Sequence, residues 1–295
     1  MNSSLAYHTL ISPEALQALR QQNAGRANAV VVFDCRADLA DHQAGRRAYE
    51  AGHLPGAHFL SLEDVLSGAK NGRNGRHPLP AREALAATLA ACGVDDESTQ
   101  IVAYDSHGGM YAARLWWLVR WLGHARVAVL DGGLPAWQAA GLPLDTREAP
   151  AVPGRFAPAA ALQATVDAQT LLADQASRRL TVVDARSPDR YRGENETIDP
   201  VGGHIPGALN RFFKDNLASD GRFKSKAELR EAWQALLDGR AMQDVVLQCG
   251  SGVTACHNAL ALAVAGLDGA RLYPGSWSEW CSDPARPVAR GTAAG

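Results

Sequence analysis

The stretch QCGSGVTACHNALAL, residues 248–262, places one cysteine, Cys249, between an apolar segment and a loop of small residues. The preceding DVVLQ is typical of a short buried strand, and the following TACHNALALAVAGL is typical of a helix. Gly250 and Gly252 allow the loop to turn successive N–H groups inward, as in anion-binding loops at helix N-termini. Such surroundings favour the thiolate, which is the nucleophilic form of cysteine. Cys249 is therefore a candidate nucleophile, although a buried packing residue is the commoner state of a free cysteine.

Composition limits the classes of protein to consider. The 295 residues are enough for two domains, and a hydrophobic fraction of 46% with 20% charged residues is typical of a globular chain. The formal net charge of −2 argues against a nucleic-acid partner. The N-terminal stretch has no basic segment followed by an apolar core, and no apolar run reaches membrane-spanning length. We expect a cytoplasmic protein with no membrane contact.

The cysteines are five, an odd and scattered set. They are Cys35, Cys92, Cys249, Cys256 and Cys281. Neither a CxxC pair nor a Cys/His cluster with zinc spacing is present, so free thiols are favoured over disulfides or a structural metal. The sequence predicts no metal and no cofactor.

The chain contains an internal repeat. VVVFDCRADLADHQAGRRAYEAGHLPGAHFLSL, which begins at Val30, is echoed by LTVVDARSPDRYRGENETIDPVGGHIPGALNRFF, which begins at Leu180. Later, IVAYDSHGGMYAARLWWLVRWLG parallels VVLQCGSGVTACHNALALAVAG, and VLDGGLPAW parallels RLYPGSWSEW. Order and spacing are preserved, so the two halves should share one fold.

Each half alternates short β-branched runs with helical segments, which predicts an α/β fold with a mostly parallel sheet covered by helices on both faces. Residues 141–160 are rich in proline and alanine and predict a linker. We expect an N-terminal domain at 1–145, a linker at 146–160 and a C-terminal domain at 161–295.

The halves differ where the chemistry would occur. The position of Cys249 in the second half is Asp105 in the first, within DSHGG. An acid is unsuited to a loop that binds anions, so we expect the first domain to keep the fold without the activity. Paired α/β domains often form a site in the cleft between them, and we expect the first domain to supply one wall.

The Asp-x-Arg strand ends, the GHIPGA segment, the CGSGVTA loop and the GSWSEW segment together resemble the tandem rhodanese-type sulfurtransferases. The resemblance extends from about Leu5 to about Cys281. It implies an inactive N-terminal rhodanese domain, a catalytic C-terminal one, and sulfur transfer through a persulfide on Cys249. The acceptor would be thioredoxin, another small thiol or cyanide.

Within that family the cysteine loop separates two groups. Thiosulfate sulfurtransferases resemble Cys-Arg-Lys-Gly-Val-Thr, whereas 3-mercaptopyruvate sulfurtransferases resemble Cys-Gly-[Ser/Thr]-Gly-Val-Thr, the form present here. Positive residues beside the thiolate suit a compact dianion, while Gly250 and Ser251 carry no charge. We therefore expect 3-mercaptopyruvate as the donor, bound by the loop residues 250–254, which are Gly250, Ser251, Gly252, Val253 and Thr254. Their N–H groups would stabilise charge on the thiolate and on the persulfide.

Arg190, in DRYRG, matches the arginine of the family's Arg-aromatic-x-Gly segment, and this match implies that it binds the donor anion. An arbitrary arginine would more often form a surface salt bridge. Mercaptopyruvate enzymes usually have a second arginine nine residues later, but Asp199 occupies that position here, and Arg192 is a conceivable substitute. This departure leaves thiosulfate:cyanide sulfurtransferase activity as an alternative.

Ser251 matches a loop serine that some family members pair with a histidine and an acid from the first domain. His77, in GRHPLP, and Glu63, in SLEDV, stand at the corresponding places. The resemblance thus implies a relay of Glu63, His77 and Ser251, against the alternative that His77 is a surface residue beside a proline turn.

Several other residues are predicted to be structural. Asp34 with Arg36 and Asp184 with Arg186 recur in both halves, and so do His53 and His204, so their role does not depend on a thiol. Trp277 and Trp280 are expected in the core, with a place in the pocket lining as the alternative. Cys256 is expected to be a buried packing residue and not a resolving thiol, and His257 to lie on the surface of its helix.

Two rival functions are weak. A phosphatase with a Cys-x5-Arg loop needs an arginine six residues after the cysteine, where Ala255 stands. A rhodanese domain that only binds partners would not need Cys249, both loop glycines and Arg190.

Overall fold

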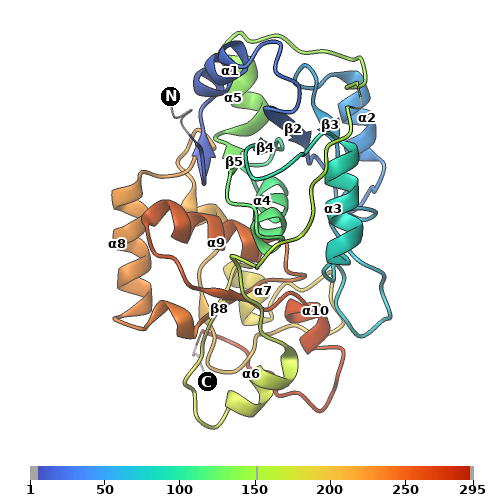
Figure 1. Ribbon diagram of the computed structural model, residues 1–295. Helices are drawn as coiled ribbons and strands as arrows, with labels where there is room; N and C mark the ends of the chain where they lie inside the picture. The colour runs from blue at the N-terminus through green and yellow to red at the C-terminus, as the bar shows by residue number, and fades with distance from the viewer. Residues whose placement is uncertain (1–5, 151, 293–295) are drawn as a thin grey trace. The chain divides into compact units, whose positions relative to one another are not determined.

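The computed structural model describes residues 6–150 and 152–292. The chain forms two compact units (Figure 1). The first unit comprises Met1–Leu66, Pro80–Leu162 and Ser219–Phe223, and the second comprises Ser67–Leu79, Gln163–Ala218 and Lys224–Gly295. Among the described residues, none of the helices is both long and apolar enough to cross a lipid bilayer.

The first unit is built on a parallel sheet with the strand order β1-β5-β4-β2-β3. The strands are β1 (Leu10–Ile11), β2 (Val30–Asp34), β3 (His58–Phe59), β4 (Gln100–Tyr104) and β5 (Val127–Leu130). The central strand β4 is buried along its whole length, so both faces of the sheet are covered there. This is why its sequence is continuously apolar and does not alternate.

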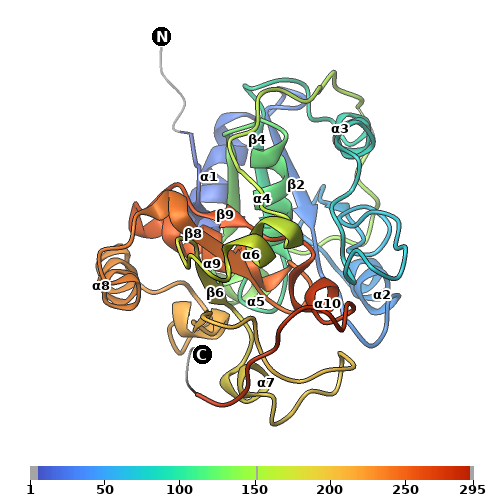
Figure 2. The same ribbon diagram turned by 90° about the horizontal axis from the view of Figure 1, so that it is seen from below.

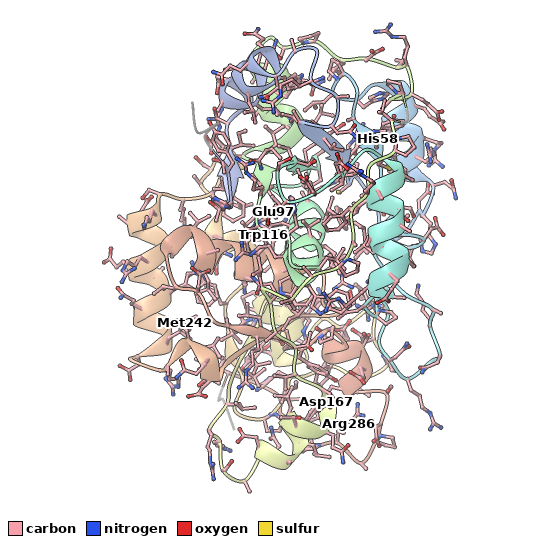
Figure 3. All side chains as sticks on the ribbon, in the orientation of Figure 1. His58, Glu97, Trp116, Asp167, Met242 and Arg286 are labelled. Carbon is pink, nitrogen blue, oxygen red and sulfur yellow. The ribbon has the colours of Figure 1, made fainter. Side chains whose placement is uncertain are left out.

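Helices α1 (Pro13–Gln22) and α5 (Gly133–Ala139) share a core cluster with one face of this sheet. Helix α4 (Ala112–Trp121) packs against β4 and β5. Its residue Trp116, labelled in Figure 3, is fully buried, and its Nε1 donates to the His8 carbonyl oxygen at 2.8 Å. The remaining helices of this unit are α2 (Ala44–Ala51) and α3 (Arg82–Ala91).

The second unit repeats this topology. Its parallel strands follow the order β7-β6-β8-β9, which matches β3-β2-β4-β5 of the first unit. They are β6 (Thr181–Asp184), β7 (Leu209–Asn210), β8 (Val245–Gln248) and β9 (Arg271–Leu272). The counterpart of β1 is reduced to a single parallel bridge between Thr165 and Leu272. The predicted α/β fold with mostly parallel sheets is confirmed in both halves.

Helices α6 (Ala168–Asp174), α7 (Pro188–Arg192) and α10 (Ser276–Trp280) contribute to one core cluster, which includes Trp277 and Trp280 as predicted. Helix α9 (Thr254–Ala265) packs against β8 and β9. Helix α8 (Lys226–Leu237) lies beside α9 (Figures 1 and 2). Two short 3-10 helices, η1 (Phe213–Asn216) and η2 (Met242–Asp244), complete the unit.

The repeated Asp-x-Arg motif forms the same buried ion pair twice. Arg36 Nη2 lies 2.6 Å from Asp34 Oδ2, and Arg186 Nη2 lies 2.6 Å from Asp184 Oδ2. In each case the same Nη2 also donates to a glycine carbonyl oxygen at 2.7 Å. In each repeat the ion pair ties the end of the strand to a later loop, which confirms the predicted structural role of the motif.

The repeated glycine-histidine motif behaves likewise. His53 stacks on Tyr49 and His204 stacks on Tyr191, each with ring centroids 3.8 Å apart. The Nδ1 atom of each histidine is hydrogen-bonded to the carbonyl oxygen of its tyrosine, at 2.7 and 2.8 Å. Both histidines are fully buried, so they shape the domain as predicted.

One segment of the first half belongs to the second unit, which a simple cut at residues 146–160 does not anticipate. Residues 67–79 pack there, and Gly75 adopts φ +83° and lies so close to Gly275 that an added Cβ would be 2.6 Å from its carbonyl oxygen. The next residue, Arg76, donates its N–H to Ser278 Oγ at 3.0 Å. His77 and Arg76 therefore lie in the same unit as Cys249.

Candidate active site

Cys249 directly follows β8 and precedes the loop that leads into α9. Cys249 is 2% exposed, and its Sγ accepts hydrogen bonds from the N–H groups of Ser251 at 3.4 Å and Gly252 at 3.1 Å. The thiol thus lies in a backbone cradle just before the N-terminus of a twelve-residue helix. Within the described residues, the N–H groups of Gly250, Val253 and Thr254 form no such bond to Sγ.

The backbone of Cys249 is fixed by the start of α10. Its N–H donates to Ser276 Oγ at 3.1 Å, and its carbonyl oxygen accepts the Trp277 N–H at 3.0 Å. Ser276 adopts φ +53°, a left-handed conformation that is unfavourable for a residue with a side chain. Its Oγ also donates to the Tyr273 carbonyl oxygen at 2.9 Å, so side-chain bonds hold the strained residue. Sequence reasoning missed Ser276 because no pattern signals a left-handed serine.

The two loop glycines serve different purposes. Gly252 adopts φ +81°, and an added Cβ would lie 2.3 Å from the Pro274 carbonyl oxygen, so only glycine fits. Gly250 has no positive φ, but an added Cβ would lie 2.9 Å from Arg76 Nη2 and 3.6 Å from Arg190 Nη2. The predicted conformational freedom is confirmed for Gly252. At Gly250 the backbone does not require glycine, and an added Cβ would contact the ends of two arginine side chains.

Arg190 lies against the cysteine loop, where the sequence predicted an anion-binding arginine. It is carried by α7, which begins at Pro188 and ends before Gly193, a left-handed cap. Its Nε and Nη2 donate to the two carboxylate oxygens of Glu196 at 3.1 and 2.8 Å, and Nη2 also donates to Asp199 at 3.3 Å. The bidentate pair orients the guanidinium across Gly250.

Asp199 brings a second arginine to the same place. Its side chain is 2% exposed and forms ion pairs with both Arg76 and Arg190. Arg192 points elsewhere, toward the exposed Glu194 at 2.7 Å. The sequence analysis missed Arg76 because it lies 123 residues before Asp199. Its place directly before His77 was the one available signal.

The two arginines beside Gly250 are matched by two carboxyl groups, those of Glu196 and Asp199. Burial raises the pKa of Asp199, although Arg76 and Arg190 oppose this. Burial would also raise the pKa of Glu196, but hydrogen bonds from Arg190 and from the N–H groups of Asp199 and Ile198 outweigh it and lower that pKa. The two pKa values shift in opposite directions because Glu196 accepts more hydrogen bonds and because its charge raises the pKa of Asp199. With both ionised, two arginines and two carboxylates sum to a formal charge of zero.

Ser251 and His77 meet as expected. Ser251 Oγ lies 2.7 Å from His77 Nδ1, and both residues are buried. His77 is thus not the surface residue of the alternative interpretation. Glu63 belongs to the first unit, where its carboxylate lies 3.9 Å from His42 Nε2. The part of Glu63 in a relay stays a prediction.

The structure tests the predictions for two further residues of α9, Cys256 and His257. Cys256 is fully buried and donates its thiol to the Gly252 carbonyl oxygen at 3.2 Å, as expected for a packing residue. The surface position predicted for His257 is wrong, because it is fully buried with its ring 5.4 Å from that of Phe213. Helix α9 packs against the sheet and α8, so it has no broad exposed face there.

The first unit has the matching loop, with Asp105 in the place of Cys249. Its carboxylate accepts four backbone N–H groups at 2.7 to 3.0 Å, from His107, Gly109, Tyr111 and Ala112. The expectation that an acid is unsuited to such a loop is therefore wrong. The carboxylate is itself the anion that the cradle binds.

Together these features define a tandem α/β protein with one cysteine in an amide cradle beside two arginines. The rhodanese-like domain model matches residues 12–140 and 167–283, and the chain belongs to the rhodanese family. In the part of the chain that the structure describes, no cluster of three or more histidine, cysteine or acidic residues could hold a metal ion.

The family relatives include a probable 3-mercaptopyruvate sulfurtransferase of Pseudomonas aeruginosa, 50% identical over 89% of this chain and 93% of the relative. A putative thiosulfate sulfurtransferase, SseB of Mycobacterium tuberculosis, is 44% identical over 90% of this chain and 92% of its own length. Among solved structures, SseA of Escherichia coli, described as a 3-mercaptopyruvate sulfotransferase, matches with a TM-score of 0.75 and 30% identity. That match covers 92% of this chain and 99% of SseA.

Proposed function

We propose that this protein is a sulfurtransferase that takes sulfur from 3-mercaptopyruvate through a persulfide on Cys249. The observation that carries the proposal is the Cys249 Sγ, which accepts N–H groups from Ser251 and Gly252 beside two arginines at Gly250. The cradle stabilises negative charge on sulfur, and the arginines attract an anionic donor. The 50% identical relative bears the same activity in its name.

In the first half-reaction the Cys249 thiolate attacks the thiol sulfur of 3-mercaptopyruvate. The new S–S bond forms as the C–S bond breaks, and its electron pair leaves on carbon as the enolate of pyruvate. Protonation of that carbon gives pyruvate, and Cys249 carries one added sulfur. Ser251 Oγ, hydrogen-bonded to His77, is suited to stabilise or protonate the enolate.

In the second half-reaction an acceptor takes the outer sulfur. A thiolate attacks it to form an acceptor persulfide, and the S–S bond electrons return to Cys249 as thiolate. Cyanide reacts in the same way and leaves as thiocyanate. The cradle serves both the thiolate and the ionised persulfide.

The zero formal charge of the groups around Gly250 supports 3-mercaptopyruvate as the sulfur donor. A monoanion such as 3-mercaptopyruvate needs two oriented donors but no excess of positive charge, whereas a thiosulfate dianion gains most from a net positive site. Thiosulfate is the second candidate, because two guanidinium groups flank Gly250 and the relative SseB carries that activity in its name.

The proposal extends to the organisation of the chain. Residues 1–145 form a non-catalytic domain, 146–160 a linker and 161–295 the catalytic domain, to which 67–79 contribute Arg76 and His77. We further expect the protein to act in the cytoplasm, with thioredoxin, a small thiol or cyanide as acceptor.

The deciding experiment compares kcat/KM for 3-mercaptopyruvate and thiosulfate with a dithiol or cyanide as acceptor. Faster turnover of thiosulfate overturns the donor assignment. Mass spectrometry after donor treatment should find one added sulfur on Cys249 and none in Cys249→Ser. Sulfur on another residue refutes the nucleophile.

A further inference from the structure

Arg76 and Arg190 each have one guanidinium nitrogen beside the cysteine loop that does not bind Asp199 or Glu196. Arg190 uses Nε and Nη2 for Glu196 and Asp199, and Arg76 uses Nη1 for Asp199. Within the described residues, Arg190 Nη1 and Arg76 Nη2 make no hydrogen bond. Both lie against Gly250, at 3.7 and 2.9 Å from the place of an added Cβ.

This arrangement defines the chemistry of a ligand. Two guanidinium edges from different directions suit a planar group with two acceptor oxygens, which is a carboxylate. The Arg76 and Arg190 side chains are 28% and 20% exposed, while the carboxylates that pair with them are almost fully buried. The guanidinium groups are therefore held from the buried side by ion pairs, and each side chain keeps some contact with solvent.

We propose that Arg76 and Arg190 together bind the carboxylate of the sulfur donor, and that Asp199 is the positioning residue that fixes Arg76 and sets the preference for a monoanion. The inference rests on the proposed function and deepens it, because it assigns part of donor binding to Arg76, which comes from the first half of the sequence. Ser278, which accepts the Arg76 N–H at 3.0 Å, holds the backbone of the same residue.

The role of Asp199 follows from its two ion pairs. Its carboxylate bridges Arg76 and Arg190 and keeps the two guanidinium groups together in spite of their like charge. It also cancels one positive charge, so a dianion gains less than it would from two unopposed arginines. In this proposal Asp199 both orients the two guanidinium groups and sets the preference for a monoanionic donor.

The first test removes the Arg76 guanidinium while keeping a polar side chain. Arg76→Gln should lower kcat/KM for 3-mercaptopyruvate by about 30-fold, mainly through KM, because one charged hydrogen bond to the carboxylate is lost. With the methyl ester of 3-mercaptopyruvate, which has no charged carboxylate, wild type and variant should differ by less than about threefold. Arg73→Gln, in the exposed part of the same segment, is the matched control and should equal wild type. An equal loss with the acid and the ester overturns the inference.

Direct binding separates this inference from the proposed function. Calorimetry with pyruvate, the carboxylate product, is carried out on Cys249→Ser and on Cys249→Ser with Arg76→Gln. The inference requires a Kd at least about tenfold weaker in the second protein, whatever the turnover of the wild type. If wild type fails to use 3-mercaptopyruvate but this difference is present, the proposed function fails alone. Equal Kd values overturn the carboxylate site.

The second test concerns selectivity. Asp199→Asn keeps the shape of the side chain but leaves a formal charge of +1 around Gly250. The ratio of kcat/KM for 3-mercaptopyruvate over thiosulfate should fall at least about tenfold. A merely structural role would lower both values in proportion, so an unchanged ratio contradicts the assignment.

Discussion

The loops around Asp105 and Cys249 come from the same position of a duplicated fold and have opposite uses. Asp105 occupies its cradle with a carboxylate that accepts four N–H groups. Cys249 occupies its cradle with a sulfur that accepts two, in a loop opened by two glycines. The Asp105 cradle is filled by a carboxylate of the chain itself, whereas the Cys249 cradle surrounds the sulfur that we propose as the nucleophile.

From this difference we expect the Asp105 loop to stabilise the first unit and the Cys249 loop to carry the proposed chemistry. In the first unit a buried charge is satisfied by the backbone, so the loop is a fixed structural element. In the second unit the sulfur accepts only two backbone N–H groups among the described residues, and Arg76 and Arg190 lie next to Gly250 of that loop. Substitutions in the two loops should therefore separate the two properties.

The largest effect is expected at the nucleophile. Cys249→Ser should lower kcat/KM by about 10,000-fold or more, because an alcohol is a far weaker nucleophile toward sulfur. Urea denaturation should find the unfolding free energy within about 1 kcal/mol of wild type, since the substitution is nearly isosteric. A large loss of stability would mean that Cys249, like Asp105, has a structural role.

The next effect concerns the other loop. Asp105→Ala should lower the unfolding free energy of the first unit by about 3 kcal/mol, because four buried N–H groups lose a charged acceptor. Folded Asp105→Ala at low temperature should still form the Cys249 persulfide, which mass spectrometry can measure. Asp105→Asn, which retains one acceptor oxygen, is the matched control with a smaller loss. If Asp105→Ala unfolds like wild type, the cradle does not stabilise the first unit.

A smaller effect is expected at the hydroxyl beside the thiol. Ser251→Ala should lower kcat for 3-mercaptopyruvate by about 30-fold, because the enolate loses a hydrogen-bond donor. His77→Asn should have a similar effect if the two residues act together, and the double variant should then lose little more. Independent, multiplying losses would indicate that the hydrogen bond between them is incidental to the reaction.

The smallest effect is on stability at Asp199. Burial raises the pKa of this carboxyl in the folded state, so its contribution to stability is favourable at low pH and is lost as the pH rises through the raised value. The stability of wild type relative to Asp199→Asn should therefore fall as the pH rises from the ordinary range of an aspartate, about 4, to pH 7. Thermal denaturation of both proteins at several pH values measures this, and a relative stability of wild type that rises with pH contradicts it.

Much of the architecture could be predicted because it depends on local patterns. The apolar strands, the duplication and the Asp-x-Arg pairs lie within short stretches of sequence, and the structure confirms them. The position of Cys249 at a strand-to-helix turn follows from the same reasoning. Arg190 and the pairing of Ser251 with His77 followed from the family resemblance.

The remaining features depend on contacts between distant parts of the chain. Arg76 lies beside Gly250 within the second unit, where Gly75 packs against Gly275 and the Arg76 N–H donates to Ser278 Oγ. The absence of an arginine at position 199 left thiosulfate as an alternative donor in the sequence analysis, which did not single out Arg76 as the second arginine beside Gly250. Sequence alone also could not assign Asp105, because the same residue type fits a lost function and a filled cradle equally well.

The crossing of residues 67–79 into the second unit has a consequence for how such a chain can be recombined. A C-terminal fragment cut at the linker would retain the nucleophile but lose Arg76 and His77. The two halves of the sequence therefore cannot be exchanged independently, even though they repeat one another. If Arg76 binds the donor as proposed, exchange of the first half for that of a relative with another residue at this position would change donor selectivity without any substitution in the second half of the sequence.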